Sequence, residues 1–157
     1  MLTVLQEALA EAHGLAIAAS AAVDRVERRT ADRDLRRRLD ELRLDAAEAR
    51  ARCLDAERSF GDEVLARANT ISDRAADLAG AWFKAGTGPL SAWTFLAMGE
   101  AGEVAAWSAL RLLAEREGRL MELAEWGLEV QRRHLELALD GVELLAGRLE
   151  PAAPRWG

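Results

Sequence analysis

Apolar residues recur every three or four positions over long stretches of this chain, and that spacing is what most limits its possible folds. The spacing is typical of long amphipathic helices that each carry one apolar stripe. Alanine and leucine, with 33 and 25 copies, make up more than a third of the 157 residues, whereas proline and the β-forming residues are sparse. This bias predicts an all-α protein and argues against a sandwich, a barrel or a doubly wound sheet.

The pattern predicts five helical stretches, at residues 2–29, 33–59, 63–84, 90–116 and 119–149. Short connections make the first and second stretches, and the fourth and fifth, antiparallel neighbours. We therefore expect an up-down four-helix bundle in which the third stretch is a helical crossover between the second and third bundle helices. The bundle would form a single domain over residues 1–150, followed by a short C-terminal tail at residues 151–157.

Composition and charge limit the classes of function. The formal net charge of −6 argues against a dedicated nucleic-acid binder. No apolar run reaches the roughly 18 residues of a membrane span, and the first residues do not resemble a signal peptide. Lone Cys53 excludes an internal disulfide framework and a Cys-based zinc cluster. We expect a cytoplasmic protein with neither nucleic-acid nor membrane partners, and the sequence assigns it no reaction.

Acidic and imidazole side chains interrupt two of the apolar stripes. Glu100 and Glu103 lie on the stripe of the fourth stretch, and His134 lies on that of the fifth. A buried carboxylate is costly unless it is paired, protonated or bound to a metal. Counting outward from the turn at Gly118 places Glu103 and His134 at about the same height. The sequence therefore predicts that these side chains meet in the core.

Further candidate ligands lie at the same height on the first two stretches, namely His13, Asp45 and Glu48. Carboxylates and imidazoles gathered in an apolar shell suit an iron or manganese site. The full set of candidate metal ligands is Glu100, Glu103, His134, Asp45, Glu48 and His13. Plainer alternatives stay open, since the carboxylates can form surface ion pairs and His134 can be a core histidine bonded to one carboxylate.

The segment from Leu96 to Trp107 reads LAMGEAGEVAAW, and the following stretch contains Gln131-Arg-Arg-His134. Together they resemble the C-terminal half of the ferritin-like bacterial bundles. The segment Thr30-Ala-Asp-Arg-Asp-Leu35, with the helix after it, is similar to the second helix of the small stress-associated members. The resemblance implies a ferritin-like fold and an iron or manganese cofactor.

The ligand motifs of this chain depart from the pattern of that family. In its di-iron members two helices each supply one Glu, and two supply a Glu-x-x-His pair. Here the second stretch reads Asp45-Ala-Ala-Glu48, with Glu where His would be. The last stretch reads Gln131-Arg-Arg-His134, with Gln where Glu would be. The departures leave room for one metal, an altered site or none.

Three hypotheses about function follow. The first is a ferritin-like protein that binds iron or manganese in the bundle core. The second is a metal-free relative of that fold that acts as an interaction or scaffold protein, as a homodimer. The third is an enzyme or carrier with a small-molecule pocket in the core. Small stripe residues such as Gly127 and Gly141 either leave such space or let helices approach closely.

Overall fold

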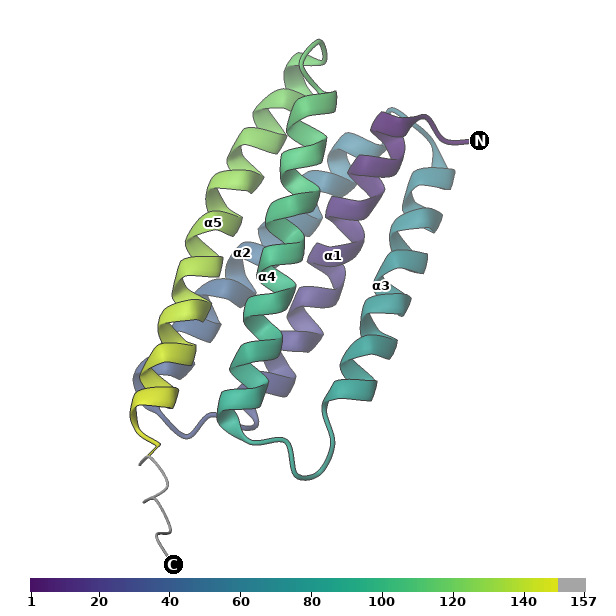
Figure 1. Cartoon of the computed structure of the whole chain (residues 1–157). Helices are drawn as coiled ribbons and strands as arrows, with labels where there is room; N and C mark the ends of the chain where they lie inside the picture. Colours follow the sequence, from purple (N-terminus) through teal and green to yellow (C-terminus); the bar gives the residue numbers. More distant parts are fainter. Residues whose placement is uncertain (150–157) are drawn as a thin grey trace, which may run out of the picture.

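The computed structural model describes residues 1–149, which form five packed α-helices whose axes are roughly aligned and whose chain direction reverses at each connection (Figure 1). Their bounds are α1 Val4–Glu27, α2 Arg33–Glu57, α3 Asp62–Trp82, α4 Pro89–Leu113 and α5 Gly118–Gly147. The all-α prediction is confirmed, and each expected stretch contains or closely overlaps one helix. The expected tail at residues 151–157 lies outside the described residues.

Local hydrogen bonds explain where the helices begin. Asp32 caps α2, because its Oδ1 accepts the backbone N–H groups of Asp34 and Leu35, both at 2.9 Å. Two residues earlier, Thr30 donates its hydroxyl to the Val26 carbonyl. Its Oγ1 also accepts the indole N–H of Trp93 at 3.0 Å, which ties the α1–α2 turn to α4.

Four of the helices form a closed ring in which α1 contacts α2, α2 contacts α5, α5 contacts α4, and α4 contacts α1. The remaining helix, α3, lies beside α1 and touches α2 more lightly (Figure 1). We expected a crossover helix between the second and third bundle helices, and no such element is evident. Instead, α3 is one of five packed helices.

The close contact between α1 and α3 explains this difference. A Cβ atom at Gly14 of α1 would lie 2.6 Å from the Ala68 carbonyl oxygen and 2.7 Å from the Ile71 Cβ. Only glycine lets the backbone of α3 come this near. Because small residues bring the two helices together, α3 packs along its length without the leucine stripe that marks the other helices.

Two tryptophans of α4 fix its register against α5. The Trp107 ring fills the space above Gly127, and the Trp93 ring fills the space above Gly141. A Cβ at either glycine would lie within 2.3 Å of the nearest ring carbon. Glu100 lies midway in sequence between the tryptophans, and His134 midway between the glycines. Antiparallel packing in this register therefore brings Glu100 opposite His134.

The apolar core has two parts that share no residue. One contains Leu9, Cys53 and Trp107, and the other contains Val23, Leu39 and Trp93. Along α4 and α5 the region between the two parts contains four buried polar residues, Glu100, Glu103, Gln131 and His134, beside the apolar Ala106 and Val130. The middle of the bundle is therefore the place to look for chemistry. Within residues 1–149, no helix is long and apolar enough to cross a membrane.

We expect Gly127→Ala to destabilise the protein by about 1–3 kcal/mol, because its methyl group would overlap the Trp107 ring in a packed core. Urea unfolding measures the change. Gly80→Ala is the matched control, since Gly80 is also helical but its Cβ would meet nothing within 4 Å. The control should be neutral or slightly stabilising. Equal stabilities for the two variants would contradict the proposed register contact.

Candidate metal centre in the bundle core

Five side chains from three helices form what we call the polar layer. They are Asp45 of α2, Glu100 and Glu103 of α4, and Gln131 and His134 of α5. All except Asp45 are buried, with at most 4% of each residue exposed. Ionisable groups are rarely this deep unless they are paired or functional, so the layer is the candidate site.

His134 lies between two carboxylates. Its Nε2 is 2.8 Å from Asp45 Oδ2, and its Nδ1 is 3.5 Å from Glu100 Oε2. Asp45 Oδ2 also accepts a 2.8 Å hydrogen bond from Arg133, whose side chain is half exposed. The Asp45 carboxylate therefore sets the orientation of the imidazole ring and connects the buried layer to the surface.

The two carboxylates control the charge of His134. Burial by itself lowers the pKa of the imidazole, but the nearby Glu100 carboxylate, and after it Asp45, outweigh burial and raise the pKa above 6.5. The charged imidazolium is therefore more favoured here than in a free histidine. In that state both ring nitrogens carry protons, so the Asp45 contact is a charge-assisted hydrogen bond.

At Glu103, burial is not offset by a nearby opposite charge, because no cation faces this side chain at hydrogen-bond distance in the described residues. Burial, and then the charge of Glu100, raises its pKa well above 4.5, which favours the neutral acid. Among residues 1–149, Glu103 Oε2, Glu100 Oε2 and Gln131 Oε1 are buried without a hydrogen-bond partner. Unsatisfied oxygens this deep are costly unless something else binds them.

A second buried pair lies farther along the bundle. His13 Nδ1 of α1 is 2.8 Å from Glu57 Oε1 of α2, and both side chains are at least 96% buried. Burial, followed by the charges of Glu57 and Glu103, raises the pKa of the Cys53 thiol far above its usual value. Cys53 therefore lies near carboxylates of both sites and stays a protonated, unreactive thiol.

Of the six expected ligands, the structure joins Asp45 and Glu100 to His134, and Glu103 lies buried one helical turn from Glu100 on α4. The other two lie elsewhere: His13 pairs with Glu57, and Glu48 pairs with Arg52 on the surface. The expected pairing of Glu103 with His134 is off by about one helical turn. Gly118 is the first residue of α5 and not the centre of the turn, so a register counted from it is shifted, whereas the tryptophan contacts align Glu100 with His134.

Two polar residues of the core were not among the expected ligands. Gln131 was noted only as a departure from a motif, although it lies three residues before His134 and so shares its face. Glu57 was missed altogether. It lies four residues after the buried Cys53, and that helical spacing could have placed it on the buried side of α2.

The side chains of the polar layer are of the types that bind iron or manganese, but their present positions do not form a site. Carboxylate oxygens, imidazole nitrogens and amide oxygens suit those ions. Two oxygens of the layer's acidic side chains have no hydrogen-bond partner. However, within residues 1–149 no three His, Cys, Asp or Glu side chains are gathered closely enough to hold a metal ion. Side-chain movement would have to accompany binding.

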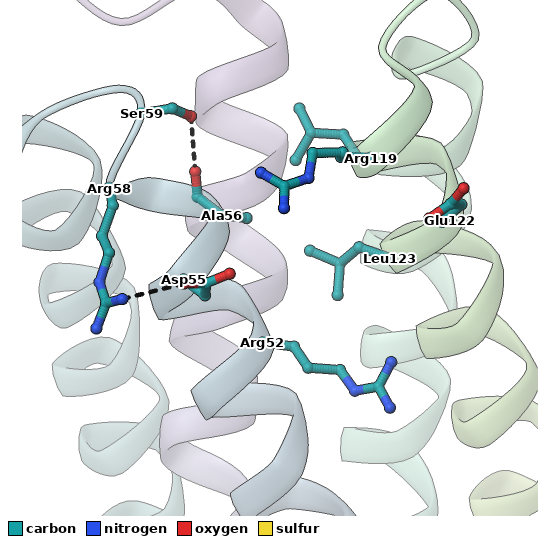
Figure 2. A pocket seen from close by; sticks show the side chains of 9 residues that line it. Arg52, Asp55, Ala56, Arg58, Ser59, Arg119, Glu122 and Leu123 are labelled. Atoms are coloured by element: carbon teal, nitrogen blue, oxygen red, sulfur yellow. Dashed lines mark hydrogen bonds and ion pairs between the residues drawn. The ribbon is translucent and has the colours of Figure 1, made fainter.

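A separate surface cleft lies between α2 and α5 near the α4–α5 turn, with a volume of about 560 Å³ (Figure 2). Three arginines line it, but Arg58 is paired with Asp55 at 3.1 Å, and Arg52 is paired with Glu48. Arg52 also lies 4.1 Å from the centre of the Trp126 ring. Two of the three arginines are thus already paired and only Arg119 is not in an ion pair within residues 1–149, so the cleft is a weaker candidate than the polar layer.

Comparison with known proteins leaves the family open. The chain matches no protein-family model, no curated protein and no solved structure. Any assignment of function therefore depends on the residues of this chain.

Because the pKa of Glu103 is raised in the folded protein, we expect the free energy of unfolding to fall as pH rises. The unfolded chain loses the Glu103 proton near pH 4.5, whereas the folded protein keeps it to higher pH. Stability is therefore lost between pH 4.5 and the pKa of Glu103 in the folded protein. His134 adds to the fall above 6.5, because its raised pKa stabilises the fold only while the ring is charged. Each unit of raised pKa corresponds to about 1.4 kcal/mol.

Glu103→Gln should flatten this pH profile, since glutamine resembles the protonated acid and does not ionise. Urea unfolding at a series of pH values measures the slope. Glu48→Gln, which changes a half-exposed carboxylate, is the control and should keep the wild-type profile. If the Glu103→Gln variant also keeps the wild-type pH profile, Glu103 does not have a raised pKa in the folded protein.

Proposed function

We propose that this chain is a ferritin-like helical protein that binds a divalent iron or manganese ion in the polar layer of its core. The observation that carries the proposal is the pair of buried, unsatisfied oxygens, Glu100 Oε2 and Glu103 Oε2. They lie one helical turn apart on α4, and the nearer one is 3.5 Å from the imidazole of His134. Buried acceptor oxygens that lack a hydrogen-bond donor can be satisfied by a bound cation, and hard divalent cations take oxygen ligands.

The residues that would hold the ion are Glu100, Glu103 and His134. The 3.5 Å between Glu100 Oε2 and His134 Nδ1 is longer than a good hydrogen bond. It is close to the roughly 3 Å that separates two donors on one metal ion, given donor–metal distances of about 2.1 Å. Asp45 would hold Nε2–H of the ring, as carboxylates commonly do for metal-binding histidines.

Protons should compete with the metal. His134 must lose a proton before Nδ1 can bind an ion, and Glu103 must ionise. Both groups have raised pKa values, so both hold their protons more strongly than the free side chains do. The ion would supply the positive charge that the unprotonated layer lacks, and affinity should increase with pH. The proposal extends to metal binding and assigns no reaction.

Iron(II) or manganese(II) should raise the midpoint of thermal unfolding of the wild-type protein. Saturation at 100 times the dissociation constant would add about 2.7 kcal/mol of stability. Anaerobic titration followed by differential scanning fluorimetry, with metal analysis of the gel-filtered protein, measures binding. Glu103→Gln should remove the shift while leaving the metal-free protein folded.

Glu48→Gln is the matched control for the metal test, because Glu48 was an expected ligand that lies on the surface with Arg52. It should bind metal as the wild type does. Absence of a shift in the wild-type protein at pH 8 would overturn the proposal. The polar layer would then be a structural element held by protonated Glu103 and by the His134 ion pairs.

A further inference from the structure

The outer side of α4 carries no charged residue that points away from the bundle. Within the helix, Glu100 and Glu103 are buried, and Arg111 pairs sideways with Glu125 of α5 at 3.8 Å. Its core side faces α5 and α1, and in Figure 1 nothing covers the opposite side. Charged residues make up 31% of the chain, so an uncharged exposed face along a 25-residue helix needs an explanation.

The uncharged residues follow a second heptad pattern, separate from the one that faces the core. Alternating steps of three and four residues connect Thr94, Met98, Ala101, Ala105, Ser108 and Leu112. Met98 is 53% exposed and Leu112 is 65% exposed. Between these two large side chains the stripe is small, which is the pattern that lets a helix from another chain approach closely.

The adjoining side of α5 carries a matching stripe. The same alternating steps connect Met121, Glu125, Leu128, Arg132, Leu135, Leu139, Val142 and Ala146, of which Leu128 is buried in the core and Val142 packs against it. Leu139 is 47% exposed, and Glu125 and Arg132 are the charged members. The contact between Arg111 and Glu125 places this stripe beside the outer side of α4. We call the two stripes together the α4/α5 outer face.

We propose that a second copy of this chain covers the α4/α5 outer face, in an antiparallel arrangement with a two-fold axis near Ala105. The axis relates Met98 of one copy to Leu112 of the other, because each lies seven residues from Ala105. Large side chains then meet large ones, and the small residues meet at the centre. The pattern is self-complementary, as an isologous interface requires.

Charge and area support a second copy. In the register set by the tryptophans, Ala105 of α4 is level with residue 129 of α5, so the axis brings Arg132 of one copy to the height of Glu125 of the other. The dimer therefore contains two pairs of opposite charge, each between Arg132 of one copy and Glu125 of the other. Two adjacent helices, about 38 Å long and together about 20 Å wide, cover roughly 750 Å², close to the ~800 Å² per partner of a standard interface.

Light scattering coupled to size exclusion should give twice the mass of one chain at micromolar concentration. Ala105→Arg places a charge at the axis in both copies and should weaken the dimer about 30-fold or more, as substitutions at interface centres do. Ala76→Arg, at an exposed position of α3, is the matched control and should stay dimeric. Circular dichroism checks that both variants remain helical.

The charge pairs test the orientation separately. Arg132→Glu should weaken the dimer, and adding Glu125→Arg with Arg111→Glu, which also reverses the Arg111–Glu125 pair within each copy, should restore it. A wild-type chain that stays monomeric at its highest soluble concentration would overturn the proposal and point to a different partner. A dimer that survives Ala105→Arg, or one lost in the Ala76→Arg control, would also overturn it. None of these outcomes depends on metal binding.

Discussion

The contact of two tryptophans with two glycines is the constraint on which the rest of this structure depends. Trp93 and Trp107 each need a glycine on α5, and the equal sequence spacing of both pairs permits one antiparallel register. A slide of α5 by one helical turn would drive both rings into side chains. The same register aligns Glu100 with His134, so apolar packing at two heights positions the polar groups between them.

The polar layer lowers stability relative to an apolar core of the same shape. Each buried ionisable group loses hydration, and the contacts within the layer recover only part of it, since Glu100, Glu103 and Gln131 each keep an unsatisfied oxygen. Apolar packing at both ends of the bundle offsets this cost. Natural cores commonly keep such an arrangement where it serves binding or fixes one pairing of helices.

The sequence predicted the helices well because each apolar stripe is long and its ends carry ordinary signals, such as the Asp32 cap and the Pro89 start. Burial of Glu100, Glu103 and His134 was predictable for the same reason, since each interrupts a stripe. The register of α4 against α5 was not predictable, because the apolar pattern does not show where the α4–α5 turn begins and ends. The position of α3 also escaped prediction, since it depends on one close backbone contact at Gly14.

The separation of the core into two apolar parts has a consequence for how this protein can vary. Side chains such as Leu9 and Leu39 belong to different parts and share no packing neighbours in the core. Substitutions at opposite ends of the bundle should therefore have additive energetic effects. Each end can be repacked, by evolution or in the laboratory, while the middle stays as it is.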